Sequence, residues 1–107
     1  MKSRIFVLQA AEDDIFEVYK YTLENDSNQN AVCVYDQLRE TINTLEEYPE
    51  RGHYPPELER IGVTGFLEIH FKPYRILYEI DGREVFIHAV LDGRRDIQSI
   101  LERRMFR

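Results

Sequence analysis

The first half of the chain repeats apolar residues every three or four positions, in two runs separated by a polar break. The residues of the first run that share one helix face are Ile15, Val18, Tyr19, Thr22 and Leu23. Those of the second run are Ala31, Val34, Tyr35, Leu38, Ile42 and Leu45. This spacing predicts two amphipathic helices. Residues 25–28 hold Asn, Asp and Ser, which cap helices, so the two helices are expected to form an antiparallel hairpin.

Short apolar runs predict four strands around this hairpin. One lies before it at residues 5–8, and three follow it at residues 64–71, 74–80 and 83–91. β-Branched and aromatic residues are frequent in these runs, as they are in strands. Asp81-Gly82, between the last two runs, is typical of a hairpin turn.

The remaining segments complete the predicted fold. Residues 53–62 contain two prolines and are expected to be irregular and exposed, whereas Ile97, Ile100, Leu101 and Met105 have the spacing of a short final helix. The element order is therefore β-α-α-β-β-β with a further helix at the end. It predicts an α+β fold in which the helical hairpin packs on one face of a mainly antiparallel sheet. The 107 residues show no linker and no repeat, so residues 1–107 are expected to be one domain.

Charge is distributed unevenly along the chain. The net charge is −6, which argues against direct nucleic-acid binding. Residues 1–59 carry five Lys and Arg against thirteen Asp and Glu, a net of −8, whereas residues 94–107 carry five Arg against two acids, a net of +3. The C-terminal arginines are therefore a candidate contact surface on an otherwise acidic protein.

Composition also indicates the compartment. No apolar run approaches the roughly 20 residues of a membrane helix, and the apolar residues near the N-terminus are too few for a signal peptide. Cys33 is the single cysteine and suits a reducing environment. We expect a cytoplasmic protein that does not associate with membranes.

Patterns for metal or cofactor chemistry are weak. His53, His70, His88 and Cys33 do not have the spacing of zinc ligands, although His70 and His88 could meet across strands. The glycines match neither phosphate-binding pattern, and the serines lack a nucleophile-elbow context. The sequence therefore predicts no metal and no cofactor.

Arg75 has two possible interpretations. Strand alternation places it on the face opposite Tyr74, Ile76 and Tyr78. These three residues are largely apolar and are expected to lie in the core. Arg75 could pair with a strand acid such as Glu68, or with Glu79. It could instead contact a partner, and the same alternatives apply to Arg94 and Arg95, which follow the last strand.

Several segments, taken in order, resemble the RelE/ParE superfamily of bacterial toxins. They are residues 65–78 (GFLEIHFKPYRILY), 87–90 (IHAV), 92–96 (DGRRD) and 101–104 (LERR), preceded by 11–15 (AEDDI) and 45–52 (LEEYPERG). The resemblance covers nearly the whole chain. It implies a β-α-α-β-β-β core, toxicity when unopposed, and neutralisation by a cognate antitoxin.

Two branches of this superfamily imply different chemistry. RelE-type members cut messenger RNA on the ribosome with basic strand residues, arginines and a C-terminal tyrosine. Arg75 and Arg95 stand where two such arginines would be, and His70 could assist them. However, Glu68 and His70 occupy the strand that should supply lysines, and no tyrosine follows Tyr78. A carboxylate such as Glu68 would repel a phosphate group. Most of the residues that RelE-type cleavage uses are therefore absent from this sequence.

The sequence resembles the ParE-type branch more closely, because the segments YRI-x-Y, GRRD and L-x-R occur in that order. Its members act on DNA gyrase without being enzymes, which implies a gyrase inhibitor with no catalytic residue. The residues expected to bind the target or the antitoxin are Arg75, Arg94, Arg95, Arg103, Arg104 and Arg107. A homodimer or a higher toxin–antitoxin assembly would be compatible with this role. The alternatives are a RelE-like ribonuclease and a non-toxic binding module with the same fold.

Overall fold

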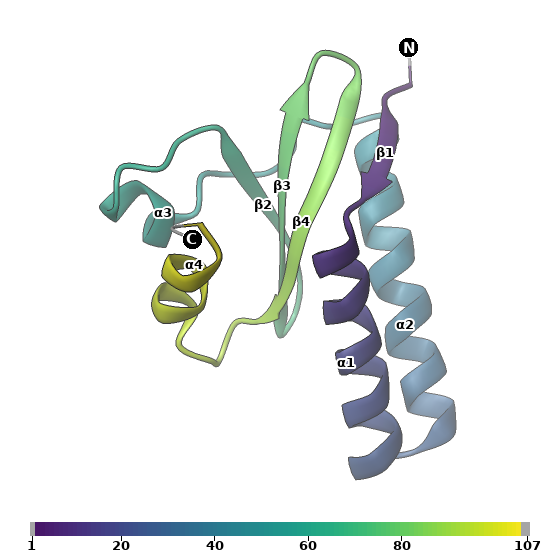
Figure 1. Cartoon of the computed structure of the whole chain (residues 1–107). Helices are drawn as coiled ribbons and strands as arrows, with labels where there is room; N and C mark the ends of the chain where they lie inside the picture. Colours follow the sequence, from purple (N-terminus) through teal and green to yellow (C-terminus); the bar gives the residue numbers. More distant parts are fainter. Residues whose placement is uncertain (1, 106–107) are drawn as a thin grey trace.

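The computed structural model describes residues 2–105 (Figure 1). Its elements, in chain order, are β1 (Arg4–Val7), α1 (Gln9–Asn25), α2 (Asn28–Asn43), the short 3₁₀ helix η1 (Thr44–Glu46), α3 (Pro56–Arg60), β2 (Phe66–Phe71), β3 (Tyr74–Asp81), β4 (Glu84–Asp92) and α4 (Ile97–Met105). The predicted order is confirmed, with α3 as an addition. Arg107 and the side chain of Met105 lie outside the described part. None of the helices in residues 2–105 is long and apolar enough to cross a membrane.

The four strands form one mixed sheet in the order β1-β4-β3-β2. β3 is antiparallel to both of its neighbours, whereas β1 runs parallel to β4. A parallel pair needs a long crossover connection, and the hairpin of α1 and α2 begins that connection. The turn between β3 and β4 consists of Gly82 and Arg83, of which only Gly82 has a positive φ (62°), as in a type II′ turn. The predicted α+β fold is thereby confirmed.

The hairpin of α1 and α2 covers one face of the sheet (Figure 1). Ser27 caps α2 by accepting a hydrogen bond from the backbone N–H of Asn30 at 3.0 Å. The buried residues of this layer are Ala11, Ile15, Leu38, Ile42, Leu45, Ile69, Ile76, Tyr78, Val85, Ile87 and Val90. Leu23, which helical spacing placed in the buried stripe, is 40% exposed because the far end of the hairpin extends past the sheet.

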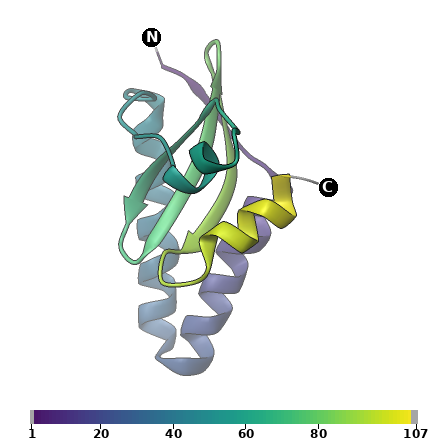
Figure 2. The ribbon, with the colours of Figure 1, turned by 90° about the vertical axis from the view of Figure 1, so that its left-hand side faces the viewer.

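The short helices α3 and α4 cover the opposite face (Figure 2). Their core is formed by Leu58, Leu77, Ala89, Leu91, Ile97, Ile100 and Leu101. The prediction that residues 53–62 are irregular and exposed is therefore wrong for α3. Pro56 begins this helix, and Leu58 is 1% exposed because it packs into the second core. The sheet is thus covered by helices on both faces.

A bulge in β4 shifts which of its residues face each core. Leu77 pairs with Ala89 and Tyr78 with Ile87, so His88 is the extra residue. Ile87 and Val90 consequently contribute to the core under the hairpin, whereas Ala89 and Leu91 contribute to the core under α4. The bulge fixes how β4 presents the segment that follows it.

The loop between η1 and α3 is anchored to the buried ring of Tyr78. The Tyr78 hydroxyl donates to the carbonyl oxygen of Pro49 at 2.7 Å and accepts from the N–H of Gly52 at 3.1 Å. Burial raises the pKa of Tyr78. The next residue, His53, pairs with Glu68 through two backbone hydrogen bonds of 3.1 and 2.8 Å. These bonds fix residues 49–53 against the outer edge of β2.

Replacing Tyr78 by Phe removes the hydroxyl and leaves the Pro49 carbonyl and the Gly52 N–H without their partner. We expect the free energy of unfolding to fall by about 1–3 kcal/mol, the cost of a buried polar group left unpaired. Urea denaturation measures this change. Tyr54→Phe is the control, since Tyr54 is 65% exposed, and should leave stability unchanged. Equal stability of the two variants would show that the Tyr78 hydroxyl does not anchor the loop.

Candidate target-binding surface

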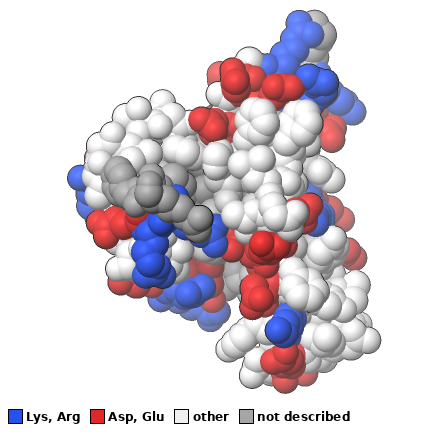
Figure 3. All heavy atoms as spheres, in the orientation of Figure 1, with Lys and Arg blue, Asp and Glu red and all other residues white. Residues whose placement is uncertain are grey.

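The turn after β4 and helix α4 carry most of the arginines predicted to bind a partner. Gly93 leads into this turn, and its N–H donates to the Pro73 carbonyl oxygen at 2.8 Å. A Cβ atom at Gly93 would lie 3.0 Å from that oxygen and 3.1 Å from Cδ of Arg75, so a larger residue would strain the contact. Basic side chains gather over α4 and the turn before it, and acidic side chains lie beside them over α1 (Figure 3).

Helix α4 begins with a side-chain cap. The Asp96 carboxylate accepts from the Ser99 N–H at 3.2 Å and from the Ser99 hydroxyl at 2.7 Å. These hydrogen bonds lower the pKa of Asp96. The cap keeps Asp96 ionised at the positive end of the helix dipole. It therefore fixes where α4 starts and how Arg103 and Arg104 are presented.

Arg104 joins α4 to α1 and β4 through Asp14. Its guanidinium donates to both carboxylate oxygens of Asp14, at 2.9 and 2.5 Å. Oδ2 of Asp14 also accepts from the Val90 N–H at 2.9 Å. The hydrogen bond to Asp14 raises the pKa of Arg104. A bidentate, partly buried pair of this kind stabilises the fold and leaves Arg104 less available to a partner than its sequence position indicates.

The other C-terminal arginines differ in how they are engaged. Arg94 donates to the carboxylate of Asp92 at 3.0 and 2.7 Å, and this hydrogen bonding lowers the pKa of Asp92. Arg95 and Arg103 are exposed, and neither forms an ion pair within residues 2–105. Arg107 lies outside the described residues. Arg95 and Arg103 are thus the cations of this surface with the most freedom to contact another molecule.

A groove of about 580 Å³ adjoins this surface. Its lining comes from α1, the ends of β3 and β4, and α4: Asp14, Glu17, Val18, Tyr21, Tyr74, Val90, Leu91, Asp92, Arg95 and Arg104. Tyr21 is well exposed, and the lining contains both acids and arginines. Mixed charge with accessible tyrosine suits a protein partner better than a phosphate backbone, which needs a uniformly basic groove. The sequence did not indicate that α1 contributes to this groove, because its residue Asp14 is far from the C-terminal arginines along the chain.

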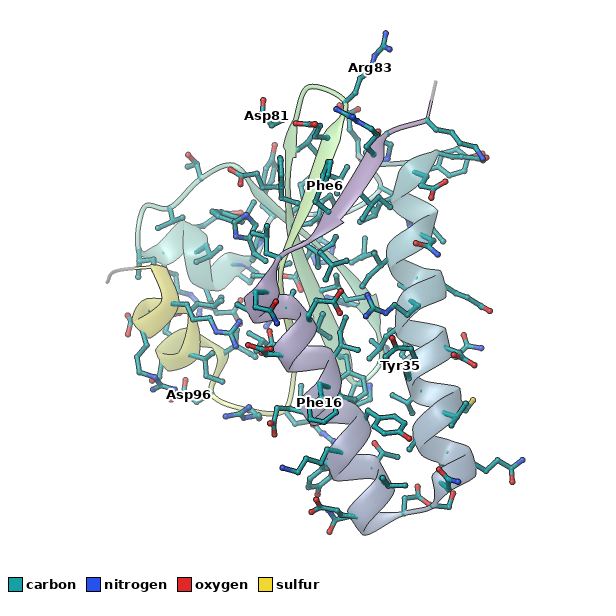
Figure 4. The ribbon with its side chains drawn as sticks, turned by 45° about the vertical axis from the view of Figure 1, so that its right-hand side comes forward. Phe6, Phe16, Tyr35, Asp81, Arg83 and Asp96 are labelled. Atoms are coloured by element: carbon teal, nitrogen blue, oxygen red, sulfur yellow. The ribbon has the colours of Figure 1, made fainter. Side chains whose placement is uncertain are left out.

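A second groove, of about 340 Å³, lies between the two helices of the hairpin. It is lined by Glu12, Phe16, Tyr19, Tyr35 and Arg39. Figure 4 shows Phe16 on α1 and Tyr35 on α2, two of the three aromatic residues that border it. Arg39 pairs with Glu12 and lies over the Tyr35 ring, 5.1 Å from its centroid. The periodicity of the sequence assigned the tyrosines to the core and gave no sign of this groove.

Arg75 is held inside the protein by two carboxylates. It donates to both oxygens of Glu57 at 2.7 Å, and to Oε1 and Oε2 of Glu68 at 2.7 and 2.6 Å. Glu68 is fully buried, and the Arg75 side chain is 15% exposed. The interpretation of Arg75 as an ion-pair partner of Glu68 is confirmed, whereas Glu79 instead contacts His88 at 2.9 Å. Four of the five N–H groups of Arg75 are therefore used within the chain.

The same network determines the charge states of its members. Hydrogen bonds from Arg75 lower the pKa of Glu57, and those to Glu57 and Glu68 raise the pKa of Arg75. Burial opposes ionisation of Glu68, but hydrogen bonds with Arg75 and His70 outweigh it and lower its pKa. Of the three residues considered for ribonuclease chemistry, Arg75 and His70 thus lie around Glu68, while Arg95 lines the groove beside α1.

Comparison with known proteins identifies the sequences and structures that this chain resembles. The profile of the family described as "ParE toxin of type II toxin-antitoxin system, parDE" matches residues 5–97. The chain is 24% identical over 98 residues to Toxin ParE3 of Caulobacter vibrioides, a match that covers 92% of this chain and 94% of that protein.

Two solved structures share the fold. The chromosomal ParDE toxin–antitoxin system from P. aeruginosa matches with a TM-score of 0.70 and 15% identity, over 83% of this chain and 94% of that one. The toxin–antitoxin complex RelBE2 from Mycobacterium tuberculosis matches with a TM-score of 0.56 and 19% identity, over 84% and 96%. At these identities the two structures bear on the fold alone.

The Arg75 network predicts a large effect on stability. Arg75→Met leaves the buried Glu68 carboxylate without its main partner, and we expect the free energy of unfolding to fall by about 3–5 kcal/mol. Replacing Glu68 by Met as well should recover part of this loss, because the fully buried carboxylate is then removed and only the less buried Glu57 lacks its partner. Arg94→Met is the matched control, since it breaks an exposed arginine–carboxylate pair and should leave urea denaturation unchanged. An equal fall in the free energy of unfolding for Arg75→Met and Arg94→Met would contradict this account.

Proposed function

The chain belongs to the ParE family of type II toxin–antitoxin toxins, and on that premise we propose that it acts in the cytoplasm by binding DNA gyrase and inhibiting it without catalysis. A cognate antitoxin neutralises it by covering the arginine surface of α4 and the preceding turn, or a surface that overlaps it. Such an antitoxin segment would order on binding, since the toxin offers grooves beside its helices for a chain to occupy.

The observation that carries this proposal is the unequal availability of the arginines. Arg75, which a ribonuclease of this superfamily would need, has two carboxylates as partners. A guanidinium that is already neutralised is poorly placed to stabilise the charge that develops on a phosphorane. Arg95 and Arg103 are exposed and have no ion pair within the described residues. Arg95 lines the same groove as the accessible Tyr21, and exposed arginine and tyrosine are frequent anchors of protein interfaces.

A ribosome-dependent ribonuclease is the second candidate. The observation that favours it is the position of His70, which contacts the Arg75 network through Glu68 and keeps its side chain 38% exposed. Histidine can transfer protons near neutral pH, so His70 could serve as an acid or base. His70→Ala separates the two candidates: it should leave gyrase inhibition intact and should abolish cleavage of messenger RNA.

The first test is pulse-labelling of DNA and protein synthesis in bacteria immediately after induction of the chain without its antitoxin. The proposal predicts an early fall in DNA synthesis while translation continues. It also predicts that the purified chain inhibits supercoiling by gyrase in vitro. An early fall in translation would favour the ribonuclease, and normal growth with both syntheses intact would leave a non-toxic binding module with the same fold.

The second test locates the contact surface. Arg95→Ala combined with Arg103→Ala should weaken inhibition of supercoiling by about tenfold or more, because truncating two anchor residues costs at least 1.4 kcal/mol of binding. Arg83→Ala is the matched control: Arg83 is also exposed but lies in the β3–β4 turn, remote from Asp96 at the start of α4 (Figure 4). Equal inhibition by the parent, the double variant and Arg83→Ala would show that α4 and the turn before it are not part of the interface.

A further inference from the structure

Two histidines and a carboxylate meet at the outer edge of β2. Nε2 of His70 lies 2.6 Å from Oε1 of Glu68, and Nε2 of His53 lies 3.9 Å from Oε2. The two imidazole rings are 5.1 Å apart between centroids and nearly perpendicular. One nitrogen or oxygen from each of the three residues lies within 4.8 Å of the others. Sequence spacing gave no indication of this cluster, because His53 reaches it from the loop before α3.

Backbone contacts fix the three residues independently of their side chains. His53 and Glu68 are direct partners in an antiparallel bridge, with N–H···O distances of 3.1 and 2.8 Å. His70 is two residues beyond Glu68 on the same strand and therefore projects from the same face. The Tyr78 hydroxyl holds the N–H of Gly52, the residue before His53. The cluster is thus already ordered before any ligand arrives, which lowers the entropic cost of binding.

The charge balance of the network favours a cation. Arg75 contributes one positive charge, and Glu57 and Glu68 contribute two negative charges. Arg75 donates once to each oxygen of Glu68, so one lone-pair direction of each oxygen is left for the histidine side of the cluster. Arg75, Glu57 and Glu68 together carry one net negative charge, which a cation bound between Glu68 and the imidazoles would balance.

The distances suit metal coordination after small side-chain rotations. Two ligand atoms at about 2.0–2.1 Å from a tetrahedral zinc ion are roughly 3.3 Å apart. The observed separations from Glu68 to the two imidazoles, 2.6 and 3.9 Å, lie on either side of this value. The histidine side chains are 61% and 38% exposed, so an ion can enter from solvent and keep water as a further ligand.

We propose that His53, Glu68 and His70 form a binding site for a divalent transition-metal ion of the zinc class. Two imidazoles and one carboxylate suit Zn²⁺ and Co²⁺ and disfavour Mg²⁺ and Ca²⁺, which prefer oxygen ligands. The ion takes the place of the hydrogen bond between His70 and Glu68 and draws His53 towards them. It clamps the loop before α3 onto β2 and stabilises the fold. This role does not depend on the proposed inhibition of gyrase.

Metal titration of the purified chain tests the site. The chain carries Cys33→Ser, because Cys33 is an exposed thiol that could bind metal elsewhere. Calorimetry with Zn²⁺ alone should give one saturable site per chain, and the Tm should rise with the Zn²⁺ concentration because the ion binds the folded state. A chelator should reverse the rise. Mg²⁺ at the same concentrations should leave the Tm unchanged.

Matched histidine variants locate the ion. His53→Asn should lower the Zn²⁺ affinity by about tenfold or more, since it removes one of three ligands. Its fold is expected to survive, because the side chain is largely exposed and the backbone bridge to Glu68 stays. His88→Asn is the control, because His88 contacts Glu79 outside the cluster, and it should bind as the parent does. Circular dichroism of the metal-free proteins verifies that both variants are folded.

Three outcomes would overturn the proposal. Absence of saturable Zn²⁺ binding would show that hydrogen bonds alone hold the three residues together. Zn²⁺ binding of equal affinity in the parent and in His53→Asn would place the ion elsewhere on the chain. A loss of Zn²⁺ affinity in His88→Asn as large as that in His53→Asn would also show that the ion does not bind specifically at His53, Glu68 and His70.

Discussion

The ion pairs of Arg75 hold the short helix α3 to strands β2 and β3 of the sheet. Arg75 lies on β3, Glu68 on β2 and Glu57 on α3, so one guanidinium joins three elements. Helix α3 has five residues, fewer than an isolated helix needs to persist in water. Its position depends on burial of Leu58 and on the contact between Glu57 and Arg75. The second core, under α3 and α4, is therefore assembled around a charged centre.

Such a centre stabilises the fold only when it is complete. Removing a charge from water costs several kcal/mol, and the cost is offset when each charge has partners at hydrogen-bond distance. No side-chain nitrogen or oxygen buried within the described residues lacks a hydrogen-bond partner. The network therefore specifies which loop and helix settle against β2 and β3. This requirement also explains why a carboxylate, Glu68, occupies a fully buried position in a strand.

The sequence predicted the elements whose signals are local. Helical spacing located α1 and α2, Ser27 marked the start of α2, and the Asp81-Gly82 signal marked the junction of β3 and β4. Strand alternation also indicated that Arg75 could pair with Glu68, because the two residues share a face of adjacent strands. Helix α3 was missed because a five-residue segment beginning at two prolines has almost no periodicity to detect.

The candidate surface was predicted less completely, because its contacts join distant residues. Asp14 and Arg104 are 90 positions apart, and no local pattern indicates that they meet. The C-terminal arginines are close together in the sequence, but the fold gives them different surroundings. Arg104 and Arg94 have internal carboxylate partners, whereas Arg95 and Arg103 project without one in residues 2–105. Net charge along the sequence therefore overstates the positive charge that the folded surface presents.

Asp14 and His53 have a common consequence for association between sheets. Strand β1 pairs with β4 only as far as Ile87, and beyond that point the Asp14 carboxylate takes the outward N–H of Val90. At the opposite side, the backbone of His53 occupies the outward N–H and carbonyl of Glu68 near the centre of β2. Exposed strand edges are templates for aggregation, because any extended chain can pair with them. On each side of the sheet, one group that is not part of a strand thus occupies backbone positions that another copy of the chain would need for pairing.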